Sequence, residues 1–388
     1  MLNRPGTIHV SYDTIATLLT DYINPKKAPG IDGLTNGMIK HLDQQHVQTI
    51  ASIFQKCIDL EYFPTAWKSA RVVLVPKPGK ESYTELSSFR PISLLPCLGK
   101  MLEKILDEWL DQSLEDNQLI NNHQYGFRKN CSAIDALDHI LSLTKGKRQT
   151  GHKVAIITFD IKGAFDNVPW SSVLEQLNLL GVPTKLVNII SSFLSDRKVQ
   201  CCYGNITVQK PTSRGTPQGS VLSPLLWNIV MNSFLNSYNN PNSNALAYAD
   251  DINIVCWSKS KTDLQKCCNK AVNNVLEWCQ NNSLELSLSK TNFICIGTKL
   301  DKVLDIAQSP TIKVLGVIID DRLSFHKHIN QQIVKCQKAS RYINKYCKLN
   351  FGLDSKKRIQ LYNAWLRPIL TYGSEIWADS LFKTSIQN

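Results

Sequence analysis

Two adjacent carboxylates divide the apolar stretch "ALAYADDINIV". The runs on either side of them, 245–249 and 252–257, are predicted to be strands. Asp250 and Asp251 then fall at the tight turn of a hairpin, whose strands must be neighbours in one antiparallel sheet. A third carboxylate, Asp160, ends the run "VAIITFD", whose continuous apolar residues are typical of a strand covered on both faces.

An acidic residue at a strand end is usually a turn former or a helix cap. If the hairpin pairs with the strand that ends at Asp160, however, three carboxylates converge. At about 4 Å, two like charges repel by roughly 4 kcal/mol at an effective dielectric constant near 20. Either one carboxyl stays protonated or a divalent cation neutralises the cluster. Oxygen ligands with no His or Cys nearby favour Mg²⁺ or Mn²⁺, and two such ions suit displacement at phosphorus.

The composition favours a globular protein with a polyanionic partner. The chain has 388 residues, 43% of them hydrophobic, and a net charge of +12. Its length fits two or three subdomains, and its basic surplus favours nucleic acid, although a merely soluble basic protein has the same total. The 12 Cys have irregular spacing, which is typical of reduced thiols. We find no signal sequence and no apolar run near about 18 residues, so we expect an intracellular protein, in the nucleus or cytoplasm, without a membrane partner.

Helical and strand patterns are mixed along the chain. Helices are expected within 11–66, at 98–114, 220–238 and 261–282, and from about residue 324 onward, where Lys and Arg are frequent. Strands are expected at 71–75, 153–161, 245–249, 252–257, 284–297 and 312–320. Because the two kinds of element do not alternate strictly, the pattern predicts an α+β fold with an antiparallel sheet that carries helices on one face.

Nine stretches, in this order, resemble the reverse transcriptases of non-LTR (LINE-type, jockey-like) retrotransposons. They are "KAPGIDGL", "VLVPKPGK", "SSFRPISLLPCLGKMLEKIL", "HQYGFRKNCSAIDAL", "ITFDIKGAFDNVPW", "RGTPQGSVLSPLLWNI", "AYADD", "LSLSKT" and "KVLGVIID". The resemblance covers roughly residues 24–375. It implies a right-hand polymerase with fingers, a palm whose antiparallel sheet is backed by helices, and a helical thumb.

The same resemblance suggests three regions. Residues 1–57 would be an N-terminal helical extension of the fingers, and 58–319 the reverse transcriptase domain with fingers and palm. Residues 320–388 would be a thumb-like basic helical region, expected to be truncated. The endonuclease and other element-encoded regions of such retrotransposons are expected to be absent from this chain.

For the chemistry, the resemblance implies a metal-binding catalytic triad and a nearby basic residue. Asp160, Asp250 and Asp251 would bind two Mg²⁺ ions, with Mn²⁺ as an alternative, and the backbone carbonyl of Ile161 would be a further ligand. Lys290 would stand beside the leaving pyrophosphate, either donating a proton or neutralising charge. An ordinary exposed lysine at a strand end is the alternative for Lys290.

For the substrate, the resemblance implies five residues. Phe165 would lie under the incoming sugar and exclude a 2′-hydroxyl, unless it is simply a core aromatic. Gln218 and Gly219 of "TPQGS" would touch the nascent base pair and the nucleotide, although a turn before a helix has the same sequence. Arg90 and Lys77 would hold the triphosphate, with a place along the template path as the alternative for Lys77.

A cluster of aromatic and basic residues suits single-stranded nucleic acid, because bases stack on rings and phosphates pair with cations. It consists of Tyr125, Phe127, Arg128 and Lys129. A folded turn with an exposed face is the alternative interpretation.

These patterns together predict an RNA-directed DNA polymerase, a nucleotidyltransferase that joins dNTPs to a primer on an RNA template. Its partners would be the RNA template, the DNA primer and dNTPs. One alternative is an inactive or domesticated RNA-binding remnant of a transposable element, for which a broken triad would be typical. Another is a nuclease with an acidic metal site, which would need neither the fingers motifs nor the "TPQGS" loop.

Overall fold

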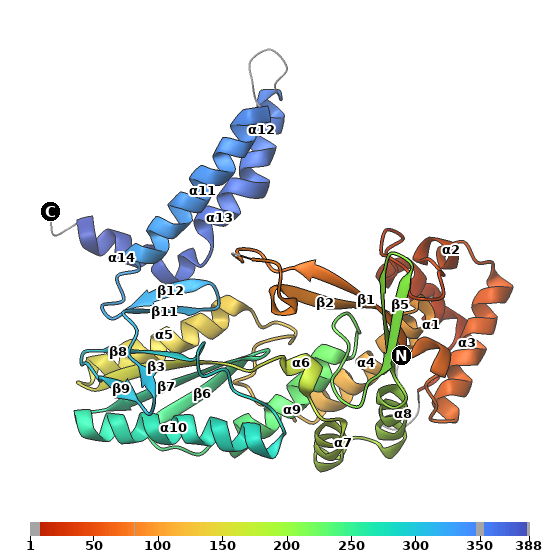
Figure 1. Ribbon diagram of the computed structural model, residues 1–388, viewed down its shortest axis with the longest axis horizontal. Helices are drawn as coiled ribbons and strands as arrows, with labels where there is room; N and C mark the ends of the chain where they lie inside the picture. The colour runs from red at the N-terminus through yellow and green to blue at the C-terminus, as the bar shows by residue number, and fades with distance from the viewer. Residues whose placement is uncertain (1–7, 81, 347–352, 386–388) are drawn as a thin grey trace. The chain divides into compact units, whose positions relative to one another are not determined.

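The computed structural model describes residues 8–80, 82–346 and 353–385. The ends of the predicted N-terminal extension and thumb, together with residues 347–352, lie outside the described residues. The chain divides into two compact units. The first unit comprises the chain up to Phe127 with 161–237 and 278–285, and the second comprises 128–160, 238–277 and the chain from Leu286 onward. Figure 1 labels the elements of both.

The first unit is rich in helices, and its N-terminal helices have polar caps and one apolar side. In α3, Asp43 accepts a hydrogen bond from the backbone N–H of His46, and Val47, Ile50 and Phe54 are buried at helical spacing. The helices of this unit are α1 (Tyr12–Thr17), the π-helical turn Leu18–Tyr22, α2 (Asn36–Lys40), α3 (Gln44–Asp59), α4 (Cys97–Asp116), α6 (Ala164–Asn167), α7 (Trp170–Leu179), α8 (Thr184–Leu194) and α9 (Ser223–Ser237).

The first unit also holds a four-stranded sheet of order β2-β1-β4-β5. Its strands are β1 (Ser69–Pro76), β2 (Phe89–Leu94), β4 (Lys198–Tyr203) and β5 (Ile206–Pro211). Only β1 is predicted from its sequence. Strand β1 pairs with β2 in antiparallel fashion and with β4 in parallel, and every residue of β5 is exposed. The apolar residues of β5 therefore face solvent and not a core.

The second unit is built on an antiparallel sheet of order β6-β7-β3-β8. Its strands are β3 (Lys153–Asp160), β6 (Ser243–Tyr248), β7 (Asp251–Ser258) and β8 (Asn292–Ile296). The predicted segment 284–297 is thus a strand only in its second half. The central strands are buried on both sides, since four consecutive residues of β3, Val154 to Ile157, are 0% exposed.

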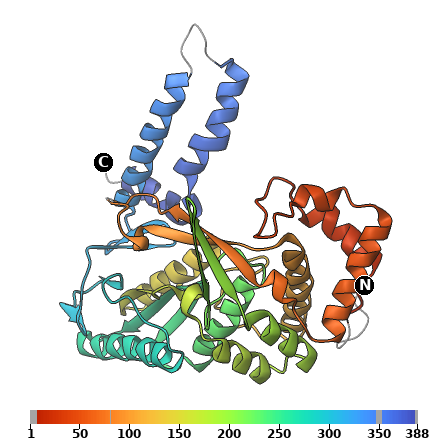
Figure 2. The ribbon, with the colours of Figure 1, turned by 45° about the vertical axis from the view of Figure 1, so that its right-hand side comes forward.

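Helices cover this sheet on both faces, which corrects the expectation of one face. Helix α5 (Ala133–Gln149) packs on β3, β6 and β7. On β7, Trp257 lies under Lys147 of α5, whereas its neighbour Cys256 contacts Cys267 of α10 (Lys261–Asn281). Successive strand residues point to opposite faces, so α5 and α10 flank the sheet, as Figures 1 and 2 show. The cause is the continuous apolar run of β3, which leaves no polar face to be solvated.

The C-terminal part of the second unit consists of two short hairpins followed by helices. The hairpin strands are β9 (Lys302–Val303), β10 (Ile306–Ala307), β11 (Thr311–Val314) and β12 (Val317–Asp320). The helices are α11 (His326–Tyr346), α12 (Ser355–Leu361), the π-helical turn Tyr362–Leu366, α13 (Arg367–Thr371) and α14 (Ser374–Ser385). Figure 2 shows α11 alongside the segment that holds α12 and α13. None of the helices in the described ranges is both long and apolar enough to cross a bilayer.

Candidate active site

The hairpin of β6 and β7 closes in a two-residue turn. Tyr248 pairs with Asp251, so Ala249 and Asp250 alone form the turn. Ala249 has a φ of +56° and is 7% exposed. The favoured two-residue hairpin turns require a positive φ, which an alanine adopts only with strain. The strained residue directly precedes the acidic pair, and strain of this kind is concentrated at functional sites.

The pairing of β3 with β7 sets Asp160 directly opposite Asp251. Like charges in such a cross-strand pair repel one another. Partial desolvation of its carboxyl raises the pKa of Asp251 to about 6, with smaller contributions from the charges of Asp250 and Asp160. Burial, followed by the charge of Asp160, also raises the pKa of Asp250. The strand pairing on which the acidic cluster depends is therefore present within the second unit.

Lys290 joins this cluster through the register of β8. Thr158 pairs with Asn292, and continuing this antiparallel register by two residues sets Asp160 opposite Lys290. The Nζ of Lys290 lies 2.8 Å from Oδ2 of Asp160, and the two side chains are 66% and 34% exposed. The carbonyl oxygen of Asp160 accepts a hydrogen bond from the N–H of Ser287, 2.8 Å away, which fixes the loop that carries Lys290. The ion pair is partly solvated, so it compensates only part of the negative charge.

The carboxylates of the acidic cluster are suitable ligands for a hard cation, and strand pairing brings their backbone positions together. Carboxylate oxygens are the ligands that Mg²⁺ takes, and a bound cation would lower the pKa values of Asp250 and Asp251, which desolvation and, to a smaller extent, neighbouring carboxylates raise. In the parts of the chain that the structure describes, however, no three His, Cys, Asp or Glu side chains gather closely enough to hold a metal ion. Asp160 is turned to Lys290 instead. Ile161 is buried and opens the next segment of the first unit.

Among the predicted substrate residues, Phe165 lies in an aromatic row of the first unit. Its ring centroid is 5.7 Å from that of the fully buried Trp227 in α9 and 6.0 Å from that of Phe127. Packing against Trp227 accounts for an aromatic residue here without reference to a sugar. The role of Phe165 as a gate stays a prediction.

The loop that carries Gln218 and Gly219 is fixed to β2. The carbonyl oxygen of Gln218 accepts a hydrogen bond from the N–H of Ser93 at 2.7 Å, and its Nε2 donates to Oδ2 of Asp166 at 3.4 Å. Gly219 has a φ of +119°, and a Cβ there would come within 2.8 Å of the carbonyl oxygen of Ser93. Only glycine meets both conditions, so this position requires its residue for backbone reasons.

Lys77 and Arg90 both belong to the β1–β2 region. Arg90 is exposed on β2, opposite Val75. Nζ of Lys77 donates to the carbonyl oxygen of Ser87 at 3.1 Å, and the charge of Lys77 lowers the pKa of Asp166, which desolvation raises. Within the first unit, Lys77 and Gln218 are thus both connected to Asp166, a residue that the sequence analysis leaves without a role.

The predicted nucleic-acid cluster is divided between the two units. Tyr125 and Phe127 end a segment of the first unit, and Arg128 and Lys129 begin one of the second. Phe127 is 56% exposed with a φ of +55°, and Lys129 is also exposed. The exposed aromatic ring is compatible with stacking, and the binding role of all four residues stays a prediction.

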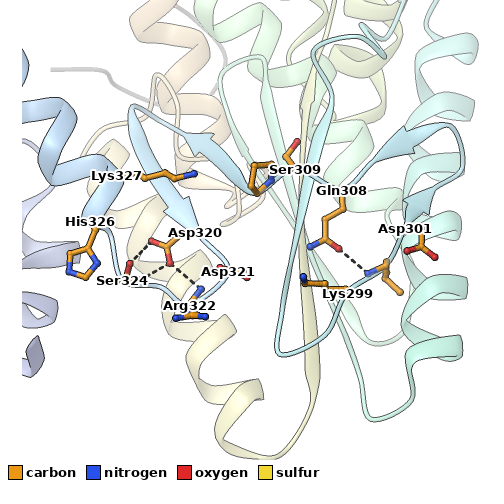
Figure 3. Close-up of a pocket in the computed structure, with 12 residues that line it drawn as sticks. Lys299, Asp301, Gln308, Ser309, Asp320, Asp321, Arg322, Ser324, His326 and Lys327 are labelled. Carbon is orange, nitrogen blue, oxygen red and sulfur yellow. Dashed lines mark hydrogen bonds between the residues drawn. The ribbon is translucent and has the colours of Figure 1, made fainter. Parts of the chain in front are cut away.

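The second unit also holds a cavity of 630 Å³, and no residue of the acidic cluster is among those that line it. Figure 3 shows the side chains of its lining. It is lined by the segments 299–301 and 308–310, the end of β12 and the start of α11. Its carboxylate at Asp320 accepts four hydrogen bonds from Arg322, Ser324 and Phe325. Burial raises the pKa of Asp320, but these bonds outweigh it and leave the pKa lowered. Asp320 therefore stabilises the turn before α11.

One residue of the first unit stands out although the sequence analysis does not identify it. Glu103 of α4 is 1% exposed and accepts hydrogen bonds from the loop that follows Gly219. The sequence does show Glu103 at helical spacing from Leu106 and Leu110, so that a carboxylate falls on the apolar side of a helix. A buried carboxylate of this kind needs a partner, and the sequence does not reveal which.

Comparison with known proteins gives concordant matches. Residues 75–319 match the family "Reverse transcriptase (RNA-dependent DNA polymerase)". The chain is 28% identical over 373 residues to the "Putative 115 kDa protein in type-1 retrotransposable element R1DM" of Drosophila melanogaster, covering 94% of this chain and 36% of that protein. It is 30% identical over 370 residues to the "RNA-directed DNA polymerase from mobile element jockey" of the same species, covering 91% and 40%.

A solved structure matches in fold alone. Apo telomerase from Candida tropicalis superimposes with a TM-score of 0.51 and 14% identity, covering 88% of this chain and 64% of that one. The α+β fold of a right-hand polymerase is thereby confirmed. The chain spans about two fifths of the length of the curated relatives it matches, 36% and 40% in the two cases above. Because the family match extends over well more than half of the sequence, the protein belongs to the reverse transcriptase family, among those of non-LTR retrotransposons.

Proposed function

We propose that this chain is the RNA-directed DNA polymerase of a non-LTR retrotransposon, and that it joins dNTPs to a primer on an RNA template. The observation that carries the proposal is the cross-strand pair of Asp160 and Asp251, with Asp250 in the adjoining turn. Two segments far apart in the sequence meet there and leave carboxylate charge that one exposed lysine compensates only in part. Membership of the reverse transcriptase family supports the class of reaction.

The acidic cluster is the proposed catalytic centre. Asp160, Asp250, Asp251 and the carbonyl oxygen of Ile161 would hold two divalent cations, Mg²⁺ or Mn²⁺. When bound, such ions activate the attacking oxygen and stabilise the leaving group. Lys290, held at Asp160 by an ion pair, is close enough to this edge of the sheet to neutralise the pyrophosphate or donate a proton to it.

Residues of the first unit would position the substrates. Gln218 and Gly219 would contact the incoming nucleotide, Arg90 and Lys77 would hold its triphosphate, and Phe165 would exclude ribose. Fixation of the loop to β2 supports the first of these roles, because a nucleotide site needs a rigid backbone.

Template and primer would bind along the basic surface of the protein. Tyr125, Phe127, Arg128 and Lys129 would bind single-stranded template. The regions 1–57, 58–319 and 320–388 are proposed as the fingers extension, the fingers with palm, and the thumb. The net charge of +12 supports a phosphate-rich partner.

Primer extension with Asp250→Asn tests the proposal. Loss of one carboxylate should lower dNTP incorporation at least about 100-fold, because each oxygen of a metal cluster is needed for its charge balance. Asp263→Asn is the matched control, since Asp263 is an exposed carboxylate on α10. Equal incorporation by wild type and Asp250→Asn would refute the catalytic assignment. Binding of RNA without incorporation at any Mg²⁺ or Mn²⁺ concentration would instead identify an RNA-binding remnant.

A further inference from the structure

Glu103 is a fully buried carboxylate on the apolar side of α4. It lies at helical spacing from Leu106 and Leu110, which are both 0% exposed, and is itself 1% exposed. A charge in this environment is costly unless hydrogen bonds and an opposite charge compensate it. Burial raises the pKa of Glu103, whereas the hydrogen bond from Ser220 and the charge of Arg197 lower it.

The hydrogen bonds of Glu103 all come from the segment just before α9. Its Oε2 accepts from Oγ of Ser220 at 2.5 Å, from the N–H of Val221 at 2.7 Å and from the N–H of Leu222 at 3.4 Å. Amide groups just before a helix lack partners within it. Glu103 therefore fixes the segment that leads into α9, although it is 117 residues from Ser220 in the sequence.

The other parts of the same loop are fixed by backbone bonds. The N–H of Thr216 donates to the carbonyl oxygen of Phe165 at 2.7 Å, and the carbonyl oxygen of Gln218 accepts from Ser93. Glu103 holds the third point, at Ser220 to Leu222. Gln218 and Gly219 lie between these points, so loss of the carboxylate removes one of the attachments that fix the segment that carries them, and leaves the bonds of Ser220 and Ser223 to the carbonyl oxygen of Pro217.

A buried cation completes the environment of Glu103. Arg197 is 3% exposed, and its Nη1 donates to the carbonyl oxygen of Phe193 at 3.0 Å. Burial lowers the pKa of Arg197 to about 10, and the charge of Glu103 opposes this shift. The guanidinium of Arg197, which lies just before β4, is thus bonded to α8. The carboxylate of Glu103 is bonded to the loop.

We propose that Glu103 is a positioning residue for the nucleotide-binding loop: by holding Ser220 to Leu222 it sets the backbone of Gln218 and Gly219, and with it the affinity for the incoming dNTP. The proposal rests on the proposed function. It assigns to Glu103 no contact with substrate. Its effect passes through three hydrogen bonds to the loop.

Steady-state primer extension separates positioning from mere stability. Glu103→Ala should raise KM for dNTP about 10-fold or more with a smaller fall in kcat, because a displaced binding group loses substrate affinity. Glu103→Gln keeps a carbonyl acceptor for the amides and should show a smaller rise. Glu108→Gln, on the exposed side of the same helix, should leave KM and kcat unchanged. Concentrations are corrected for active enzyme by titration with primer and template.

Hydrogen exchange supplies a readout that does not depend on polymerase activity. Loss of Glu103 should speed amide exchange in the segment 216–222, and Glu108→Gln should not. An unchanged KM for dNTP in folded, active Glu103 variants would overturn the proposal, as would unchanged exchange in this segment. If Glu103→Ala does not fold, Glu103→Gln carries both measurements. If the wild type fails to incorporate dNTPs, the proposed function fails, while exchange still tests whether Glu103 holds the loop.

Discussion

Glu103 in the first unit and the cluster of Asp160, Asp250 and Asp251 in the second differ in how the protein compensates carboxylate charge. In the first unit, Glu103 is buried, yet three hydrogen bonds and the nearby charge of Arg197 compensate it. In the second unit, Asp250 is half-buried and Asp251 is exposed, and the charges that act on them include those of other carboxylates. A carboxylate that serves the fold is satisfied by the protein itself. The carboxylates of the proposed catalytic centre would instead keep charge for a ligand to neutralise, at some expense of stability.

The largest expected difference between the two centres is in unfolding free energy. Glu103→Ala leaves the buried charge of Arg197 less compensated and removes three hydrogen bonds to the segment before α9, so we expect a loss of about 3–5 kcal/mol. Asp160→Asn, at the other centre, should change stability by less than about 1 kcal/mol. Urea unfolding, followed by circular dichroism in the presence of a chelator, measures both.

Equal losses from these two variants would contradict this expected difference, because the acidic cluster would then be as important for the fold as Glu103. Glu103→Gln gives an intermediate case. This variant keeps the shape and one acceptor, so its cost should lie near about 1–3 kcal/mol, the range for a buried polar group with an incomplete set of partners.

Much of the second unit was accessible from sequence because its signals are local. The apolar runs around Asp250 and before Asp160 predict strands, and the charges at their ends predict a meeting point. The position of Lys290 could not be predicted from local patterns, since only the register of β8 against β3 sets it opposite Asp160. The covering of the sheet on both faces was implied by the unbroken run in β3, but the mixed order of elements suggested one face.

The first unit was less accessible because its decisive contacts are long-range. The role of Glu103 depends on its hydrogen bond with Ser220, and no local sequence pattern connects the two residues. In β5 the sequence alternates apolar and polar residues from Ile206 to Gln209, yet every residue of this strand is exposed, so the alternation does not mark a buried face. Sequence patterns thus identified groups that lie at the ends of apolar strands, and missed groups whose partners lie in another part of the chain.

The acidic cluster should also make stability depend on pH. Asp251 has a pKa near 3.8 in the unfolded chain and about 6 in the folded protein. Between these values the folded protein keeps a proton that the unfolded chain has lost, so its contribution to stability is complete below about pH 4 and is lost as the pH rises through about 6. Because the side chain is exposed and screened by solvent, we expect a fall of about 1 kcal/mol.

Asp251→Asn cannot ionise and should remove this fall, whereas Asp263→Asn should preserve it. Unfolding by urea at a series of pH values between about 4 and 7, with a chelator present, measures the difference. A fall of the same size in wild type and Asp251→Asn would mean that other groups cause it. The comparison with Glu103 would then lose its electrostatic basis.

The smallest expected effect concerns Lys290, the cation that pairs with Asp160 in the acidic cluster. Lys290 lowers the pKa of both Asp250 and Asp251 and forms a partly exposed ion pair with Asp160. Lys290→Gln should therefore cost only about 0.5 kcal/mol at neutral pH, the range for exposed ion pairs, and high salt should abolish the cost. Lys302→Gln, at an exposed position of the same unit, is the control. A loss above about 2 kcal/mol would mean that the fold requires Lys290 as a cation, as it requires Arg197. A small loss in stability together with a large loss of incorporation would instead agree with a centre whose charges are kept for a ligand.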